Sequence, residues 1–177
     1  MSDGPIIKIG EIDLEKLKKD LEIHYFPRFE NTCPRQFPLQ GAFEGDWDGA
    51  QGNTLTLRND EGDYTVKLYE GFDYTYSIID GYNLYRTRIM NMPRATAYGW
   101  HLDLTPRIHI PITTDPACMF ILDDVVYRIP ADGGVYWVDT TLWHTAVNAS
   151  RAEFNRIHLM GNTNLTKSDA RSLADRL

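Results

Sequence analysis

Hydrophobic positions follow a helical period near the start of the chain, and a capping pattern marks a second helix at the other end. Residues 13–24 place three leucines on one stripe, with charged residues on the opposite side and Asp13 in position to cap the helix. Residues 166–177 form the second predicted helix, because Thr166 with an acidic residue three positions on resembles a capping box. Helices are therefore expected near the start and the end of the chain.

Between these helices the pattern changes to short segments rich in β-branched and aromatic residues, most of them alternating apolar with polar positions. Turn residues such as Gly, Asp, Asn and Pro separate the segments. Nine short strands with regular breaks predict a mainly β sandwich or barrel with flanking N- and C-terminal helices. The predicted strands are TLTLR (54–58), DYTVKLYE (63–70), YTYSII (74–79), YRTRIM (85–90), RIHIPI (107–112), CMFIL (118–122), VVYRI (125–129), GVYWVD (134–139) and RIHLMG (156–161).

Residues 25–53 interrupt the regular pattern. Three prolines break the first part, and residues 41–53 are rich in Gly and Asp, which predicts an exposed loop. That loop could cover a substrate or be an ordinary surface connection. With 177 residues and 42% hydrophobic content, the whole chain, residues 1–177, is expected to form a single domain.

One tetrapeptide pattern occurs twice: RIHI at 107–110 and RIHL at 156–159. On a strand, Arg and His would share one face while the aliphatic residues face the other way. Two such strands are typical of the wall of a polar cavity inside a β fold.

Composition excludes several classes of partner. The net charge is −7 and the sequence pI about 5.1, so the surface would repel nucleic acid and anionic membranes. The two cysteines, Cys33 and Cys118, fit no zinc or disulfide motif, and neither a signal peptide nor a membrane-spanning stretch is visible. We therefore expect a cytoplasmic protein that acts on a small molecule or a peptide.

Three residues suggest a metal site. His101 and Asp103 are separated by one residue, so on an extended strand both side chains leave the same face. His144 would arrive from a strand folded back alongside. Two imidazoles and one carboxylate form the facial triad of non-haem Fe(II) oxygenases, which leaves three coordination positions open. Taken alone, the His-X-Asp pair is a weak signal.

A positive charge strengthens this hypothesis. Arg156 lies a dozen residues beyond His144 and could reach the distal carboxylate of 2-oxoglutarate while the 2-oxo acid end chelates iron. Arg107 and His109 could supply further contacts to the anion. Alternatively, all three could be ordinary polar residues on the surface or hydrogen-bonded in the core.

From about residue 86 to 161 the chain resembles the aspartyl/asparaginyl β-hydroxylase family, which includes proline hydroxylase-like members. The resemblance rests on WHLDLTPRIHIPI, PADGGVYWVDTTLWHTAVN and RIHL, in that order. It implies a double-stranded β-helix (cupin or jelly-roll) that uses Fe(II) with 2-oxoglutarate and O2 as cosubstrates. By this match the iron ligands are His101, Asp103 and His144, and the cosubstrate contacts are Arg156, Arg107 and His109.

The resemblance also divides the domain into functional parts. Residues 81–164 would carry the iron and cosubstrate core, residues 1–80 the substrate side, and residues 165–177 the closing helix. Candidate substrate contacts are Arg86, Arg88 and Trp100, which could equally be exposed arginines and a core aromatic residue.

The expected activity is hydroxylation of an amino acid, free or within a peptide, of the Asp, Asn or Pro type, with succinate and CO2 as coproducts. Two alternatives remain: a metal-dependent cupin isomerase or hydrolase, and a non-catalytic cupin binding module.

Overall fold

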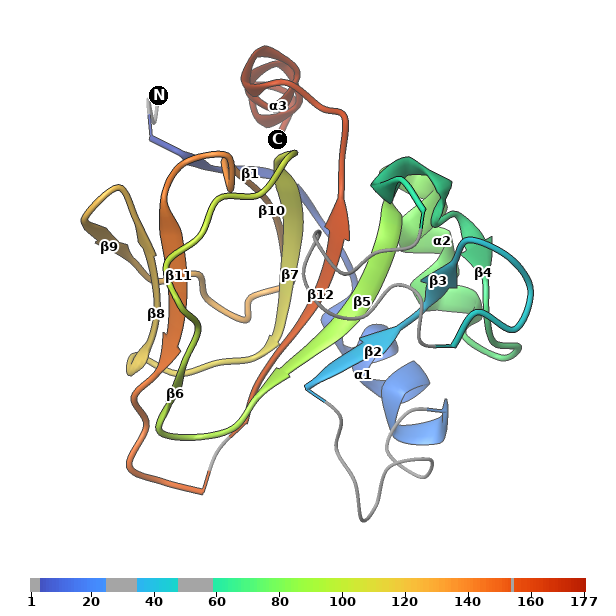
Figure 1. The fold of residues 1–177 in the computed structure, drawn as a ribbon, viewed down its shortest axis with the longest axis horizontal. Helices are drawn as coiled ribbons and strands as arrows, with labels where there is room; N and C mark the ends of the chain where they lie inside the picture. The colour runs from blue at the N-terminus through green and yellow to red at the C-terminus, as the bar shows by residue number, and fades with distance from the viewer. Residues whose placement is uncertain (1–3, 25–34, 48–58, 154) are drawn as a thin grey trace.

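A computed structural model of the chain describes residues 4–24, 35–47, 59–153 and 155–177. Its largest element is a six-stranded antiparallel sheet in the order β1–β10–β7–β12–β5–β2 (Figure 1). The strands of this sheet are β1 (Ile6–Glu11), β2 (Gln36–Pro38), β5 (Tyr85–Met92), β7 (Arg107–Thr113), β10 (Gly134–Val138) and β12 (Arg156–Asn162).

A second antiparallel sheet has the order β6–β11–β8–β9 and a third pairs only β3 with β4. Their strands are β3 (Gln40–Gly41), β4 (Val66–Lys67), β6 (Thr96–Ala97), β8 (Cys118–Leu122), β9 (Val125–Tyr127) and β11 (His144–Asn148). The helices are α1 (Leu14–His24), the 3-10 helix η3 (Glu61–Asp63), α2 (Asp73–Gly81) and α3 (Lys167–Ala174). This confirms a mainly β fold with helices near both ends, and adds α2 in the middle.

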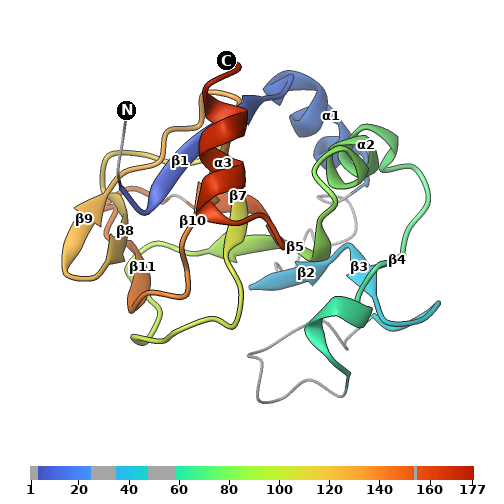
Figure 2. The same cartoon turned by 90° about the horizontal axis from the view of Figure 1, so that it is seen from above.

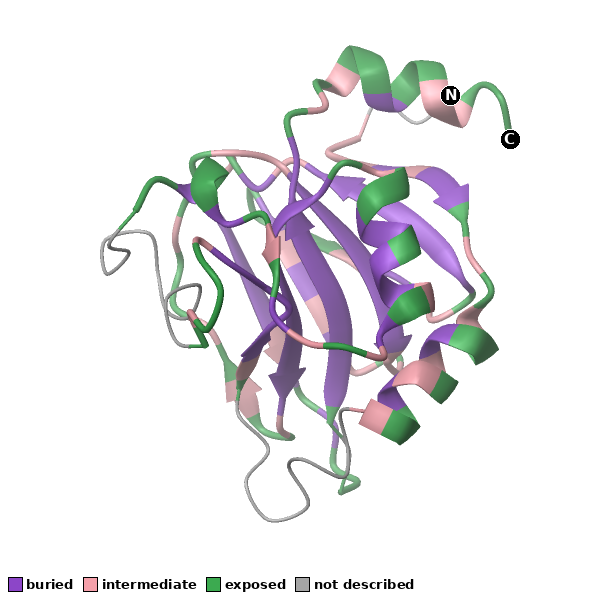
Figure 3. Ribbon diagram, turned by 90° about the vertical axis from the view of Figure 1, so that its right-hand side faces the viewer, coloured by how far each residue is buried: buried purple, intermediate pink, exposed green. Residues whose placement is uncertain are grey.

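One face of the six-stranded sheet packs against the three α-helices (Figure 2). Leucines of α1, aromatic and isoleucine residues of α2 and Ala170 of α3 share a core with alternate residues of the strands. Burying this apolar face is the main favourable contribution to folding, at roughly 25 cal/mol per Å². In Figure 3 most residues of the long strands are buried, whereas the outer sides of the helices are exposed.

The opposite face of the same sheet packs against the four-stranded sheet. Tyr136 and Val138 of β10 belong to this second core, with Phe120 of β8 and Ala146 of β11, whereas their neighbours on β10 belong to the helix side. Successive side chains of a strand point to opposite faces of the sheet. The prediction that the aliphatic residues of the two RIH segments share one face, opposite the Arg and His residues, is confirmed. The aliphatic residues lie in the helix-side core: Ile108, Ile110, Ile157 and Leu159.

Most predicted strands are confirmed, but two predictions need correction. Residues 74–79, predicted as a strand, lie in the helix α2. Of residues 63–70, only Val66–Lys67 is a strand. The strand β1 was not predicted, and TLTLR at 54–58 lies outside the described residues.

The C-terminal helix begins as the sequence predicts. The Thr166 hydroxyl accepts a hydrogen bond from the backbone N of Asp169, whose carboxylate in turn accepts one from the backbone N of Thr166, at 3.2 Å and 2.9 Å. Within the described ranges, no helix has both the length and the apolar composition needed to cross a membrane. Cys118 is a buried free thiol, and Cys33 lies outside the described residues.

Candidate metal centre and anion-binding cavity

A backbone bridge between two distant segments brings the two predicted histidine ligands together. His101 and His144 exchange both backbone hydrogen bonds, at 3.1 Å and 3.0 Å between N and O. His144 begins strand β11, as predicted. His101 and Asp103 do not lie on a regular strand, which corrects the prediction: the segment after β6 is irregular, and the backbone N of Asp103 donates to the carbonyl of Thr140 at 2.9 Å.

The three predicted ligands meet at one point. The candidate ligand atoms of His101, Asp103 and His144 all lie within 4.8 Å of one another. Nε2 of His101 is 3.9 Å from Oδ1 of Asp103, and Nε2 of His144 is 3.4 Å from Oδ2. In the part of the chain that the structure describes, no other group of three His, Cys, Asp or Glu side chains could hold a metal ion. This group could hold one.

The backbone orients both imidazoles. Nδ1 of His101 is 2.8 Å from the carbonyl of Gly99, and Nδ1 of His144 is 2.9 Å from the carbonyl of Leu142. A carbonyl only accepts, so each Nδ1 donates the hydrogen bond, and Nε2 is the ring nitrogen that faces Asp103. A cation bound between these groups would be coordinated by both Nε2 atoms and by the carboxylate of Asp103.

Arg107 completes the environment of the carboxylate. Its Nη2 donates to Oδ1 of Asp103 at 2.6 Å, and both side chains are nearly buried. Burial alone would raise the pKa of Asp103, but the neighbouring imidazole of His144 and the charge of Arg107 hold it below its ordinary value. Oδ2 has no hydrogen-bond partner among the described residues, and it is the oxygen that faces His144. Asp103 is therefore an ionised group with one oxygen left for a ligand.

The candidate ligands lie at the wall of a cavity of about 700 Å³. Residues of both large sheets and of the segment 98–104 line it, which places it between the sheets (Figure 1). The His101 side chain is 43% exposed, whereas those of Asp103 and His144 are 5% and 4% exposed. Solvent and small molecules would reach a metal bound here from the side of His101, the most exposed of the three residues.

Arg156, the first residue of β12, also lines this cavity and is buried. Burial lowers the pKa of its guanidinium to about 10, so the group remains charged at neutral pH. Its central carbon lies 5.9 Å from the centre of the Phe120 ring. Among the described residues no carboxylate forms an ion pair with Arg156. A buried charge without a counter-ion is costly, which makes this end of the cavity suited to an anion.

Two buried histidines lie behind this arginine. Nη2 of Arg156 is 3.2 Å from Nδ1 of His158, which is 3.4 Å from Nδ1 of His109. Burial, followed by the positive charge of Arg156, lowers the pKa of both imidazoles well below 6.5, so both are neutral. A neutral imidazole can accept from the guanidinium, and His158 thereby fixes the direction in which Arg156 points.

The three predicted substrate contacts have different positions. Arg88 lines the cavity and donates to Oε1 of Gln36 at 3.0 Å. Trp100 lies at the rim and is about half exposed. Arg86 does not line the cavity and forms a buried ion pair with Glu61, so the expectation of a substrate contact is not met there.

A break in strand alternation explains the position of Arg86. It has a positive φ of 50°, and the register of β5 with β12 shifts between Met160 and Asn162. Such a bulge changes which face the following residues share, so Arg86 and Arg88 do not point into the same space. The two-residue period in the sequence could not reveal this.

Several cavity residues were not predicted. Tyr98, Gln36 and Phe120 line the cavity with apolar neighbours from β5, β11 and β12. For Phe120 the alternation of CMFIL at 118–122 was an available signal. Gln36 begins the short strand β2 and Tyr98 follows the short strand β6, and no local pattern marked either residue.

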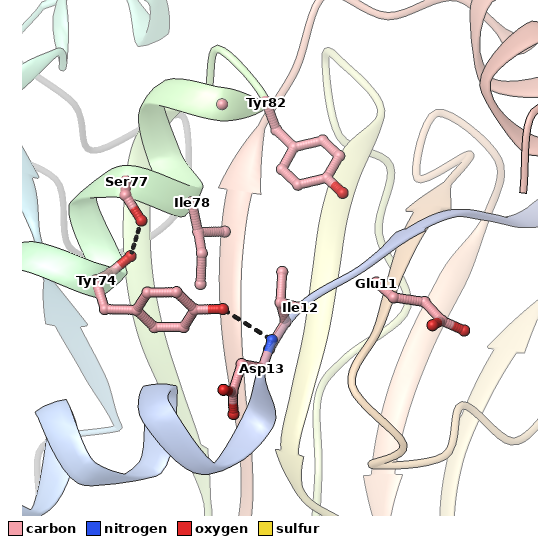
Figure 4. A pocket seen from close by; sticks show the side chains of 8 residues that line it. Glu11, Ile12, Asp13, Tyr74, Ser77, Ile78 and Tyr82 are labelled. Carbon is pink, nitrogen blue, oxygen red and sulfur yellow. Dashed lines mark hydrogen bonds between the residues drawn. The ribbon is translucent and has the colours of Figure 1, made fainter.

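A second, more open hollow lies where β1 leads into α1, beside α2 (Figure 4). The Tyr74 hydroxyl there accepts from the backbone N of Asp13 at 2.8 Å, and the Ser77 hydroxyl donates to the carbonyl of Tyr74 at 2.7 Å. These bonds tie the start of α1 to α2. The polar groups of this hollow therefore have a structural use.

Sequence comparisons add no relative: a scan against protein-family models finds no match, and a search of curated proteins also finds none.

Proposed function

We propose that this protein is an Fe(II)- and 2-oxoglutarate-dependent dioxygenase that hydroxylates an amino acid, free or within a peptide. One observation carries the proposal. Two oriented imidazoles and an ionised carboxylate converge on one point of a cavity, and a buried arginine without a carboxylate partner among the described residues lines the same cavity.

The donor set favours iron over other common metals. His101, Asp103 and His144 would supply two nitrogen ligands and one oxygen ligand, which is the facial arrangement of non-haem Fe(II) oxygenases. Structural zinc sites are usually closed by four protein ligands, and the described residues offer three here. When bound, Fe(II) activates O2, so that 2-oxoglutarate, O2 and a substrate C–H give succinate, CO2 and a substrate C–OH.

The chain's own residues also fit the cosubstrate. Arg156 would donate two parallel hydrogen bonds to the distal carboxylate, a geometry that suits a guanidinium. His109, predicted to contact the cosubstrate, lines the same cavity, and its Nε2 has no hydrogen-bond partner among the described residues. Arg107 is engaged with Asp103, so its proposed role is to orient the iron ligand.

The arrangement of strands is compatible with this assignment. Two facing antiparallel sheets with a ligand site between them are expected of a double-stranded β-helix of the cupin or jelly-roll type. Together with the resemblance of residues 86–161 to the aspartyl/asparaginyl β-hydroxylase family, this supports an amino acid substrate of the Asp, Asn or Pro type. Arg88 and Trp100 are the proposed substrate contacts.

The test is succinate formation by the purified protein with Fe(II), 2-oxoglutarate and ascorbate. We expect succinate to depend on O2, to be lost in His144→Ala, and to be accompanied by a gain of one oxygen in a peptide or amino acid substrate, measured by mass spectrometry. Metal binding without succinate would favour the alternative of a cupin isomerase or hydrolase. Neither metal binding nor succinate would leave a non-catalytic binding module.

A further inference from the structure

The four-stranded sheet has an apolar face that points away from the rest of the molecule. Phe120 and Leu122 of β8 and Ala146 of β11 point into the core between the sheets, so the residues that alternate with them point outwards. We call this the outer face. It consists of the outward residues of β8 and β11, their cross-strand partners on β6 and β9, and the residue just before β11: Ala97, Met119, Ile121, Val126, Trp143, Thr145 and Val147.

The chemistry of the outer face is not that of a sheet in water. An antiparallel sheet with one solvated face usually carries polar residues there. Here the polar member, Thr145, donates its hydroxyl to the carbonyl of Tyr98 at 2.6 Å, whereas Val126 and Trp143 are 46% and 54% exposed. In the part of the chain that the structure describes, the three α-helices pack on the six-stranded sheet instead (Figure 1). The composition is that of a sheet covered on both sides.

The strand at the edge of this face carries opposite charges at its two ends. Asp123 and Asp124 form the turn that leads into β9, and Arg128 follows β9. All three are exposed, and none of them forms an ion pair with another described residue. Nε of Arg128 donates to the carbonyl of Pro116 at 2.8 Å, which holds the guanidinium at its end of the sheet. The apolar face thus has an acidic and a basic end.

This distribution is complementary to itself. A two-fold axis that lies in the plane of contact and crosses the strands would place β9 of one copy over β9 of the other, in the opposite direction. The acidic turn of each copy would then meet Arg128 of the other copy. An isologous interface needs such a self-complementary patch, whereas an unrelated partner would need no symmetry. The charges therefore favour a second copy of this chain as the occupant.

The size of the outer face suits the centre of a dimer interface. Strands lie about 4.8 Å apart and rise about 3.4 Å per residue, so four strands of five residues present roughly 300 Å² in projection. A standard interface buries about 800 Å² per partner, with an apolar centre and a polar rim. The outer face would supply that centre, and the charged ends of β9 would belong to the rim.

We propose that two copies of the chain pack face to face through the outer face of the four-stranded sheet and form a two-fold symmetric dimer. Asp124 of each copy lies beside Arg128 of the other. Two sheets packed in this way are separated by about 10 Å, a distance that exposed Asp and Arg side chains can bridge at the rim. The inference goes beyond the proposed function and does not depend on the metal site.

Sedimentation equilibrium of the full chain tests the apolar contact. We expect the wild type to have twice the 20.4 kDa mass of the chain at a concentration on the order of 50 μM. Val126→Glu should weaken the dimer by roughly a hundred-fold or more, because it buries a carboxylate against the other copy. Val125→Glu is the matched control. Val125 is 51% exposed and adjacent in sequence, but it pairs with the inward-facing Leu122, so its replacement should leave the dimer intact.

An exchange of charges tests the symmetry. Arg128→Glu and Asp124→Lys should each weaken the dimer by roughly ten-fold, since each brings like charges together. An equimolar mixture of the two variants should dimerise again, because both contacts then join opposite charges. Circular dichroism checks that every variant is folded.

Three results would overturn the proposal. One is a monomeric wild type at that concentration. Another is a mixture that associates no better than its components. The third is a Val125→Glu variant that dissociates as readily as Val126→Glu, which would point to pairing through the edge of β9 instead of packing through the outer face.

Discussion

Arg107 donates from Nη2 to Oδ1 of Asp103 at 2.6 Å, and this bond leaves Oδ2 as the carboxylate oxygen that faces His144. The two residues are four positions apart, so a short loop places both the ligand and the group that orients it. A carboxylate held by one oxygen can present only the other to a metal. Arg107 thus decides how Asp103 would coordinate.

Replacing Arg107 should weaken metal binding without removing a ligand. We expect Arg107→Met to lower the affinity for Mn(II) by roughly ten- to a hundred-fold, the usual effect of losing a residue that orients a metal ligand. Arg107→Lys should recover part of the loss because it restores the charge but not the fork. Calorimetric titration measures both, and a wild-type affinity in Arg107→Met would exclude the orienting role.

The predicted ligands should differ sharply from a histidine elsewhere in the chain. His144→Ala and Asp103→Ala each remove one of three metal donors, so we expect the rise in melting temperature caused by Mn(II) to disappear. His24→Gln, on α1 and away from the cavity, should keep the full rise. A rise that survives in both alanine variants would mean that the metal binds at another place.

Local patterns in the sequence predict the part of the site that depends on strand geometry. The alternation in the two RIH segments correctly separates Arg156 and His158 from the aliphatic residues beside them. It fails for residues 74–79, where Tyr, Thr and Ile favour a strand by propensity. The helical spacing of Phe72, Tyr76 and Ile79 was the competing signal, and all three are buried in the core beneath α2.

Other features depend on contacts between distant segments and leave no local trace. The ion pair of Arg86 with Glu61 joins β5 to the helix η3, across 25 residues. The bulge that separates Arg86 from the face of Arg88 arises from pairing with β12, at the other end of the chain. Sequence spacing cannot show that Arg86 forms a buried ion pair within the fold whereas Arg88 lines the cavity.

Removing the buried charge of Arg156 should stabilise the protein without ligand. Arg156→Met keeps much of the volume and removes a desolvated cation that has no carboxylate partner among the described residues. We expect the free energy of unfolding to rise by on the order of 1 kcal/mol, while N-oxalylglycine binding is lost and Mn(II) binding remains. Urea denaturation measures the first effect, and a less stable variant would show that a structural partner holds this arginine.

The two neutral histidines predict a decrease in stability at acid pH. The pKa of His109 and of His158 is lowered well below 6.5 by burial, so below pH 6.5 the unfolded chain binds more protons than the native one. The contribution of these two neutral histidines to the free energy of unfolding is therefore complete above pH 6.5. It is lost as the pH falls below 6.5, by about 1.4 kcal/mol per pH unit for each histidine.

Urea denaturation at several pH values, with a chelator present, measures this dependence. His158→Gln and His109→Gln should each reduce the slope between pH 6.5 and 5 by the share of one histidine. If the slope of the double variant equals that of the wild type, these imidazoles are not the groups that take up the protons.

The most direct test is a crystal structure of the protein grown without O2 in the presence of Mn(II) and N-oxalylglycine. We predict one ion at about 2.1 Å from Nε2 of His101, Nε2 of His144 and a carboxylate oxygen of Asp103, with the distal carboxylate of the inhibitor on Arg156. An ion bound elsewhere, or an inhibitor that does not contact Arg156, would contradict the account.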